Sequence, residues 1–324
     1  MPAFDAGIAD QVIERLAGEL EQSFVFPEVG KRYASTLRAN RASGRYRRLD
    51  TAEAFAEAVT SDLQAVHQDR HLKLRPPEAA EPGAQPGPVR GPSPGNAITK
   101  AGWLADGVAY IDFAGFPGNE ATLTALRDFL ARHGDAETLI IDARGHRGGG
   151  LAEMDMMFPL LFQKEQVLVK MDTRLAVDQR GGNPFEEGGT IRKEQAPEGV
   201  VRRVHLAVPA PAAGKLRQAR VFLLTSGRTA SAAEHLSLSL KRTGRATLIG
   251  ETTRGAGHYG FGADLGGGYS AFIPVGRTFD PDTGEGWEGV GVKPDVAVPA
   301  DQALDEALKR AGVKPGAARD LASL

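Results

Sequence analysis

The sequence predicts an α/β protein in which a small bundle of helices precedes a sheet covered by helices. Apolar residues recur at helical spacing through roughly the first 70 positions, which predicts the bundle. After Gly102, short apolar runs alternate with segments of helical spacing, and this alternation is typical of a sheet with helices packed on it. A stretch rich in proline and glycine separates the two patterns.

The bundle is predicted from three helical segments. The apolar residues of the first segment share one face: Ile8, Val12, Ile13, Leu16 and Leu20. A short second segment lies near residues 29–37, and the third follows a start signal at Asp50 and Thr51. The third segment also keeps its apolar residues on one face: Phe55, Val59, Leu63 and Val66. We therefore divide the chain into a bundle at residues 1–75, a linker at 76–100 and an α/β core at 101–324.

Beyond the bundle, the linker cannot form a regular element, because residues 76–96 are dominated by proline and glycine. Strands are predicted at these apolar runs of the core: residues 108–113, 138–142 and 221–224, and the neighbourhoods of Val167, Ala246 and Tyr269. Helices are predicted near residues 123–130 and 152–162 and after Ser231. Residues 180–198 are polar and rich in glycine, so we expect a long loop there.

Composition argues against several classes of function. The 39 basic and 41 acidic residues nearly cancel, and no basic stripe indicates a nucleic acid partner. Cysteine is absent, which excludes disulfides, thiolate metal sites and a cysteine nucleophile. No apolar run approaches the length of a membrane span, so we expect no membrane insertion. The N-terminus lacks the features of an export signal, so we expect a cytoplasmic protein, or a periplasmic or secreted one if a signal has been trimmed.

Ser231 is the strongest candidate for a catalytic residue. An apolar run at residues 221–224 predicts a buried strand, a turn of small residues follows, and helical spacing resumes after Ser231. The serine is therefore expected at a helix N-terminus, where free N–H groups and the positive end of the helix dipole lie. The N–H of Ala232 would face the charge that develops during nucleophilic attack. The alternative role of Ser231 is that of a plain helix cap.

Three further segments accompany the Thr-Ala-Ser-Ala-Ala-Glu run at residues 229–234. One has Asp142-Ala-Arg144 followed by a glycine turn, one reads Gly-Glu-Thr-Thr at residues 250–253, and one reads Trp-Glu-Gly-Val-Gly-Val-Lys-Pro-Asp at 287–295. In this order the motifs resemble the S41 family of tail-specific, or C-terminal processing, serine peptidases. The likeness is strongest to its branch with interphotoreceptor retinoid-binding protein and tricorn-like cores, and it extends to the Asp-Arg-His run at 69–71.

The resemblance implies a crotonase/ClpP-like β-α core and a serine peptidase that acts on polypeptides. Processing peptidases usually carry a PDZ domain between bundle and core, and here only the linker occupies that place. No glycine-lysine loop that would cradle a phosphate is present, so we expect an ATP-independent enzyme. No zinc motif occurs, and we expect neither a metal nor a cofactor. Relatives range from monomers to large rings, which leaves a homo-oligomer open.

The resemblance also implies the partners of Ser231. Processing peptidases use a lysine downstream of the serine, but Ala256 stands at that position here, so we expect no serine–lysine dyad. The tricorn-like branch uses histidine and glutamate, and His71 and Glu288 match their motifs. Ser231 would attack the carbonyl, His71 would accept its proton, and Glu288 would orient or charge-stabilise His71.

The oxyanion of the reaction would be held by the amides of Gly149 and Ala232, with Gly148 as the neighbouring alternative. His258 lies in the glycine-rich loop just after Ala256 and is the rival base or a substrate contact. The glycine turn departs from the family pattern, because His146 stands where asparagine is usual.

Alternatives to these assignments stay open. His71 is otherwise a half-exposed histidine at the start of a strand, and Glu288 a solvated carboxylate or a partner of Lys293. At the level of function, the retinoid-binding relatives use this fold for apolar ligands, and a fold does not determine a function. A hydrolase of small amides or esters would use the same serine.

Overall fold

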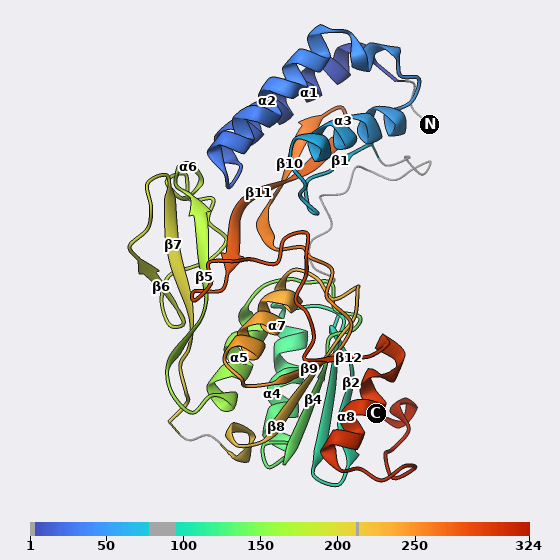
Figure 1. The fold of residues 1–324 in the computed structure, drawn as a ribbon, viewed down its shortest axis with the longest axis vertical. Coiled ribbons are helices and arrows are strands. Elements are labelled where there is room, and N and C mark those ends of the chain that lie inside the picture. Colours follow the sequence, from blue (N-terminus) through green and yellow to red (C-terminus); the bar gives the residue numbers. More distant parts are fainter. Residues whose placement is uncertain (1–3, 78–94, 212–213) are drawn as a thin grey trace.

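The computed structural model describes residues 4–77, 95–211 and 214–324, so most of the predicted linker lies outside the described residues. Figure 1 shows the N-terminal helices at the top, one sheet in the middle and a second sheet flanked by helices at the bottom. None of the helices within the described ranges is long and apolar enough to cross a membrane.

The predicted bundle consists of α1 (Ala6–Ser23), α2 (Pro27–Ala42) and α3 (Ala52–Val66). The local sequence explains where these helices begin. The Asp5 carboxylate accepts N–H bonds from the first turn of α1, Pro27 opens α2, and the Thr51 hydroxyl caps α3 at Ala54.

The apolar faces of these helices do not close a core by themselves. Leu16, Phe24 and Phe55 are fully buried in a cluster that also contains Tyr269 and Ile273, which belong to a hairpin about 200 residues further along the chain. The hairpin therefore provides the second layer that the helices need to bury their apolar surface.

The upper sheet is antiparallel, with the order β1-β11-β5-β7-β6 and with β10 paired to β11. Its strands are β1 (Leu74–Arg75), β5 (Gln166–Arg174), β6 (Ile191–Glu194), β7 (Val200–Ala207), β10 (His258–Gly266) and β11 (Tyr269–Phe279). The short helix α6 (Leu175–Asp178) follows β5. The prediction of a long loop at 180–198 was wrong in part, because β6 lies within it. Its first residue, Ile191, is buried against Val169 and Met171. The other residues of β6 are polar, so one apolar residue gives no recognisable strand pattern in the sequence.

The lower sheet has the order β12-β9-β8-β4-β3-β2, and it is parallel except for β2. Its strands are β2 (Ile98–Ala105), β3 (Val108–Phe113), β4 (Thr138–Asp142), β8 (Arg220–Thr225), β9 (Thr247–Gly250) and β12 (Val296–Ala297). The helices of this part are α4 (Glu120–Arg132), α5 (Ala152–Leu161), α7 (Ala232–Arg242) and α8 (Ala303–Ala311). Separate apolar clusters cover the two faces, and α8 belongs to the smaller one. This is the α/β architecture that the sequence predicts.

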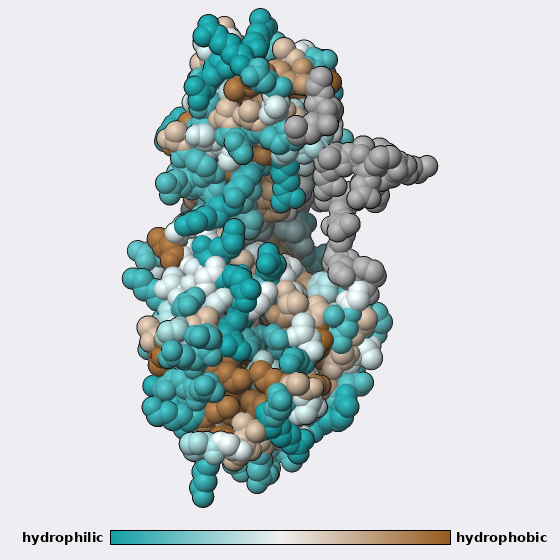
Figure 2. Space-filling view, turned by 90° about the vertical axis from the view of Figure 1, so that its right-hand side faces the viewer, coloured by the Kyte–Doolittle hydropathy of each residue, from teal (hydrophilic) through white to brown (hydrophobic). Residues whose placement is uncertain are grey.

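The topology brings two of the predicted motifs to one edge of the lower sheet. Strands β4 and β8 are parallel neighbours, with Asp142 opposite Leu224 at their carboxyl ends. The glycine turn continues from β4, and the turn to Ser231 continues from β8. Ligands of open α/β sheets bind outside the carboxyl ends of the strands, so this edge is where a site is expected. Elsewhere the surface seen in Figure 2 is mostly hydrophilic, apart from an apolar patch on its lower part.

Candidate active site

Ser231 stands in an unusual backbone conformation between β8 and α7. Its φ of 58° and ψ of −119° make it the only residue other than glycine with positive φ in the described part of the chain. A side chain in this region costs conformational energy, and such strain is retained where surrounding contacts enforce it. A strand, a sharp turn and a helix together present the serine side chain at the sheet edge, an arrangement that some hydrolases use to hold a nucleophile on a strained turn.

Glu234 enforces this turn. Its carboxylate is fully buried and accepts four hydrogen bonds: from the N–H of Ser231 at 2.8 Å, the N–H of Gly255 at 2.6 Å, the N–H of Ala256 at 2.8 Å and the hydroxyl of Thr253 at 2.6 Å. Burial raises the pKa of Glu234, and the four donors only partly oppose that shift. One side chain thus joins the Ser231 turn to the loop at residues 253–256.

The glycine turn lies against Ser231 from the other side. Gly148 and Gly149 have φ of 108° and 137°, which side chains other than glycine rarely adopt. A Cβ on Gly148 would lie 2.7 Å from the Ser231 Cβ, and one on Gly149 would lie 1.9 Å from the carbonyl oxygen of Phe116. Both positions therefore require glycine for close approach.

Two main-chain donors remain free beside the serine. Phe116 bonds to the turn on either side of Gly149, through its N–H to Gly148 and its carbonyl to the N–H of Gly150. Within the described ranges, the N–H groups of Gly149 and Ala232 donate to no protein acceptor. These are the two amides that the sequence predicts for the oxyanion.

His146 explains how the glycine turn tolerates a residue other than asparagine. The side chain is fully buried, and its Nδ1 accepts the N–H of Gly148 at 3.0 Å. Burial lowers the pKa of His146 to about 3, so the ring is neutral and can accept this bond. The edge of the ring packs on Phe116 at a centroid distance of 4.2 Å. The histidine thus supplies the local acceptor that a short amide side chain would supply.

Substituting Gly149 with alanine is expected to lower kcat/KM about 10²- to 10³-fold, the effect of losing one oxyanion donor. The added Cβ would force the turn away from Phe116 and misplace the Gly149 N–H. Steady-state kinetics on a peptide substrate would measure the loss. Gly145→Ala is the matched control in the same turn, because a Cβ there meets no atom within 4 Å. Equal kinetics for the two variants would remove Gly149 from the oxyanion site.

His71 and Glu288 face each other across a short gap. The Nδ1 atom of His71 lies 4.0 Å from Glu288 Oε2, too far for a hydrogen bond, and it is buried without a hydrogen-bond partner among the described residues. The ring lies against Phe272, with centroids 5.1 Å apart. Burial lowers the pKa of His71, and the charges of Glu288 and Asp69 raise it by less. The imidazole is therefore neutral near pH 7 and able to accept a proton.

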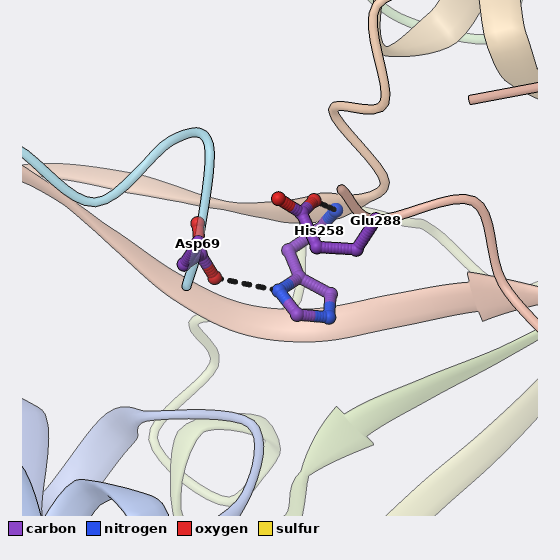
Figure 3. Close-up of side chains that lie close together, drawn as sticks. All are labelled: Asp69, His258 and Glu288. Atoms are coloured by element: carbon purple, nitrogen blue, oxygen red, sulfur yellow. Dashed lines mark hydrogen bonds and ion pairs between the residues drawn. The ribbon is translucent and has the colours of Figure 1, made fainter. Parts of the chain in front are cut away.

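A second histidine is paired with a carboxylate beside the first. His258 Nδ1 lies 2.6 Å from Asp69 Oδ2, and Figure 3 shows the other ring nitrogen pointing away from both Asp69 and Glu288. The other oxygen of Asp69 accepts the N–H groups of His71 and Leu72. Burial would raise the pKa of Asp69, but these hydrogen bonds outweigh it and leave the pKa lowered. Asp69 therefore contacts both histidines of the site.

The Asp69, His258 and Glu288 side chains each have one potential metal ligand within 4.8 Å of the others. Their hydrogen bonds already account for this proximity. Glu288 Oε1 accepts the N–H of Arg70 at 2.6 Å, and Oε2 accepts those of Gly257 at 2.6 Å and His258 at 3.1 Å. The carboxylates of Asp69 and Glu288 thus connect three chain segments through hydrogen bonds. This structural role explains why the three side chains lie close together without a bound ion.

A cavity of about 490 Å³ joins these parts. Its walls include Ser231, Gly149, His71 and His258, so the serine, one residue with a free amide and both candidate bases line one space. Glu288 is absent from the described residues that line it and lies behind His71. The structure therefore brings together residues from the N-terminal segment, both sheets and the C-terminal part of the chain.

Three contributors to this site were missed or undervalued in the sequence. Asp69 was seen only as part of a motif, and its bond to His258 spans 189 residues. Asp155 received no role, although it lines the cavity. His205 carried no signal in its strand, yet its Nε2 atom lies 3.0 Å from Asp155. No local pattern reports such long-range pairs.

Solved structures share this architecture. The photosystem II D1 C-terminal processing protease is 14% identical and superposes with a TM-score of 0.55 over 95% of this chain and 98% of that chain. A lipoprotein from Streptococcus agalactiae is 13% identical, with a TM-score of 0.56 over 96% of both chains. The tricorn protease is 13% identical, with a TM-score of 0.52 over 96% of this chain and 36% of that chain. At these identities the likeness shows a shared fold.

Family models match both parts of the chain. Residues 6–101, which contain Asp69 and His71, match the N-terminal domain of S41 peptidases in eukaryotic IRBP. Residues 107–298 match the model of peptidase family S41, and this segment contains the glycine turn, Ser231 and Glu288. Because the second match alone covers more than half of the sequence, and the strained serine and its free amides lie inside it, the chain belongs to peptidase family S41 and is a serine-type peptidase.

Proposed function

We propose that this peptidase cleaves polypeptides with Ser231 as nucleophile, His71 as general base and Glu288 as the carboxylate that stabilises the charged imidazole. The observation that carries the proposal is the strained Ser231 turn, which faces one cavity together with His71 and the Gly149 amide. A serine hydroxyl needs such a base to become nucleophilic. The free N–H groups of Gly149 and Ala232 then hold the oxyanion of the tetrahedral intermediate.

The environment of His71 supports its role as base. Its buried Nδ1 faces Glu288, so Nε2 is the nitrogen left to take the serine proton. Once protonated, the ring gains the attraction of Glu288 across the 4.0 Å gap. Distances of this kind are often long in a free enzyme and shorten when substrate binds. The proton then passes from Nε2 to the leaving amine.

His258 is the rival base. Its bond to Asp69 is the orienting contact that a catalytic histidine commonly has, and it also faces the cavity. We assign it to positioning instead, since Asp69 holds the His71 turn through two N–H bonds and His258 holds Asp69.

Labelling with a fluorophosphonate probe, followed by peptide mapping, tests the proposal. Wild-type protein is expected to be labelled at Ser231 and to cleave an unfolded polypeptide, and Ser231→Ala is expected to lose both properties. A folded protein that takes no label would instead favour the binding of an apolar ligand in the cavity. Labelling with cleavage of esters but not of peptides would favour a small-molecule hydrolase.

The pH dependence of kcat/KM should report the lowered pKa of His71. The base works only when neutral, so activity is expected to be full at neutral pH and lost as the pH falls below the ordinary histidine value of 6.5. The positive charge of Arg254 lowers this pKa. Arg254→Gln is therefore expected to raise the pKa and move the acid limb to higher pH, most clearly at low salt. Arg132→Gln on α4 is the control, and a limb that moves downward in Arg254→Gln would contradict the assignment.

A further inference from the structure

The cavity beside Ser231 contains an acidic residue held in place by a buried chain of histidines. Asp155 lies in the first turn of α5, close after the glycine turn, and lines the cavity. Its Oδ1 atom accepts the hydroxyl of Thr190 at 2.7 Å and lies 3.0 Å from His205 Nε2. Its Oδ2 atom bonds to no side chain or main-chain donor in the described ranges.

The contacts between His235, His205 and Asp155 determine which ring nitrogens carry protons. His205 Nδ1 is 2.9 Å from His235 Nε2, and both rings are buried. Burial lowers the pKa of His235, so this ring is neutral. With His235 donating to His205, the remaining N–H of His205 donates to Asp155. Hydrogen bonds thus hold the Oδ1 oxygen of Asp155 in place, and no positively charged side chain in the described ranges pairs with Oδ2.

The rest of the cavity wall suits a long cationic side chain. Glu186 adds a second carboxylate at the wall, and the described lining residues include no Lys or Arg. Leu151, Ile191 and Phe272 add apolar surface to the wall of the same cavity. Lys and Arg side chains pack an apolar stem along such surface and place the charge at its end.

We propose that Asp155 selects substrates with a Lys or Arg side chain next to the scissile bond. This inference rests on the proposed function, because it assigns the substrate class of the same site. A first-turn acid that served only the helix dipole would not need a buried histidine and a threonine hydroxyl on one oxygen and a free second oxygen. A pre-oriented carboxylate, in contrast, binds a cation without first having to be ordered.

Binding to an inactive enzyme tests the inference without depending on catalysis. Three peptides would be titrated into Ser231→Ala by calorimetry, identical except for one residue: lysine, norleucine with the same stem but no charge, or glutamate. The lysine peptide is expected to bind at least about tenfold more tightly than the norleucine peptide, and the glutamate peptide more weakly than both. Equal affinity for lysine and norleucine overturns the inference.

A second variant assigns the preference to Asp155. Adding Asp155→Asn to Ser231→Ala keeps the shape and one acceptor, and is expected to bring the lysine-to-norleucine ratio to about one. Asp128→Asn, at an exposed acid on α4, is the matched control and should keep the ratio. If the ratio survives in Asp155→Asn, the residue is not the selecting group. Should that variant fail to fold, Glu186→Gln in the Ser231→Ala background tests the assignment from the other side: a ratio that falls to about one there would give the preference to Glu186 and not to Asp155. Absence of fluorophosphonate labelling in the folded wild-type protein would refute the proposed function and leave the binding ratio to be judged separately.

Discussion

Removing the His71 imidazole is expected to lower kcat/KM about 10⁴-fold or more, which would be the largest effect of any histidine substitution in the chain. His71→Ala leaves Ser231 in its strained turn and both oxyanion amides in place, so binding should persist while proton transfer is lost. The expected signature is a fall in kcat with little change in KM. Free imidazole added to the variant should restore part of the rate, because the substitution opens a space beside Ser231.

Two matched variants make this result decisive. His67→Ala removes a histidine that caps α3 nearby and does not line the cavity, so it should keep near-normal kinetics. His258→Ala should have an intermediate effect, since it frees Asp69 and loosens the turn that carries His71. A full loss in His258→Ala with activity retained in His71→Ala would transfer the role of base to His258.

Replacing Glu234 with glutamine is expected to cause both instability and loss of activity. The NH₂ group of the glutamine would face at least two of the N–H or O–H donors that now bond to the carboxylate. Two donors cannot bond to each other, and the site is closed to water. We expect the free energy of unfolding to fall by about 3 kcal/mol or more, with a drop in Tm of about 4 °C or more. Thermal unfolding and fluorophosphonate labelling would measure the two effects.

Glu251→Gln is the control for Glu234. This carboxylate also accepts two main-chain N–H groups, from Gly227 and Ala300, but it is exposed, so water can replace either bond. Its substitution is expected to cost less than about 1 kcal/mol. Similar losses of stability in the two variants would show that the burial of Glu234 does not determine how much this residue contributes to the free energy of unfolding.

Many elements of this fold were predicted because each follows from a local pattern. The helical spacing of Ile8 to Leu20 predicts α1, and the apolar run at 138–142 predicts β4, whatever the rest of the chain does. Strands β2, β10 and β12 and helix α8 were not predicted, and β6 was missed because four residues with one buried side chain have no measurable period. Boundaries of the three predicted parts stay a prediction, and so does the oligomeric state.

The site was only partly predictable, for a related reason. Ser231 and the glycine turn combine strand, turn and small residues within a few positions, which is local information. The pairs Asp69–His258 and Asp155–His205 join residues 189 and 50 positions apart, and their proximity follows from sheet topology alone. The ring nitrogen that carries each proton depends on hydrogen-bond partners that lie far away along the chain, which no spacing in the sequence reports.

The hairpin β10–β11 has two structural roles. It completes the apolar core of the N-terminal helices, and it carries His258 at its start. His71 lies just before β1, which pairs with β11 of this hairpin, whereas Ser231 precedes α7 beside the lower sheet. A chain that has folded only its lower half would thus hold a serine with no proton acceptor. We therefore expect a molecule in which the N-terminal helices and the hairpin are not packed to lack peptidase activity, even when Ser231 and its turn are folded.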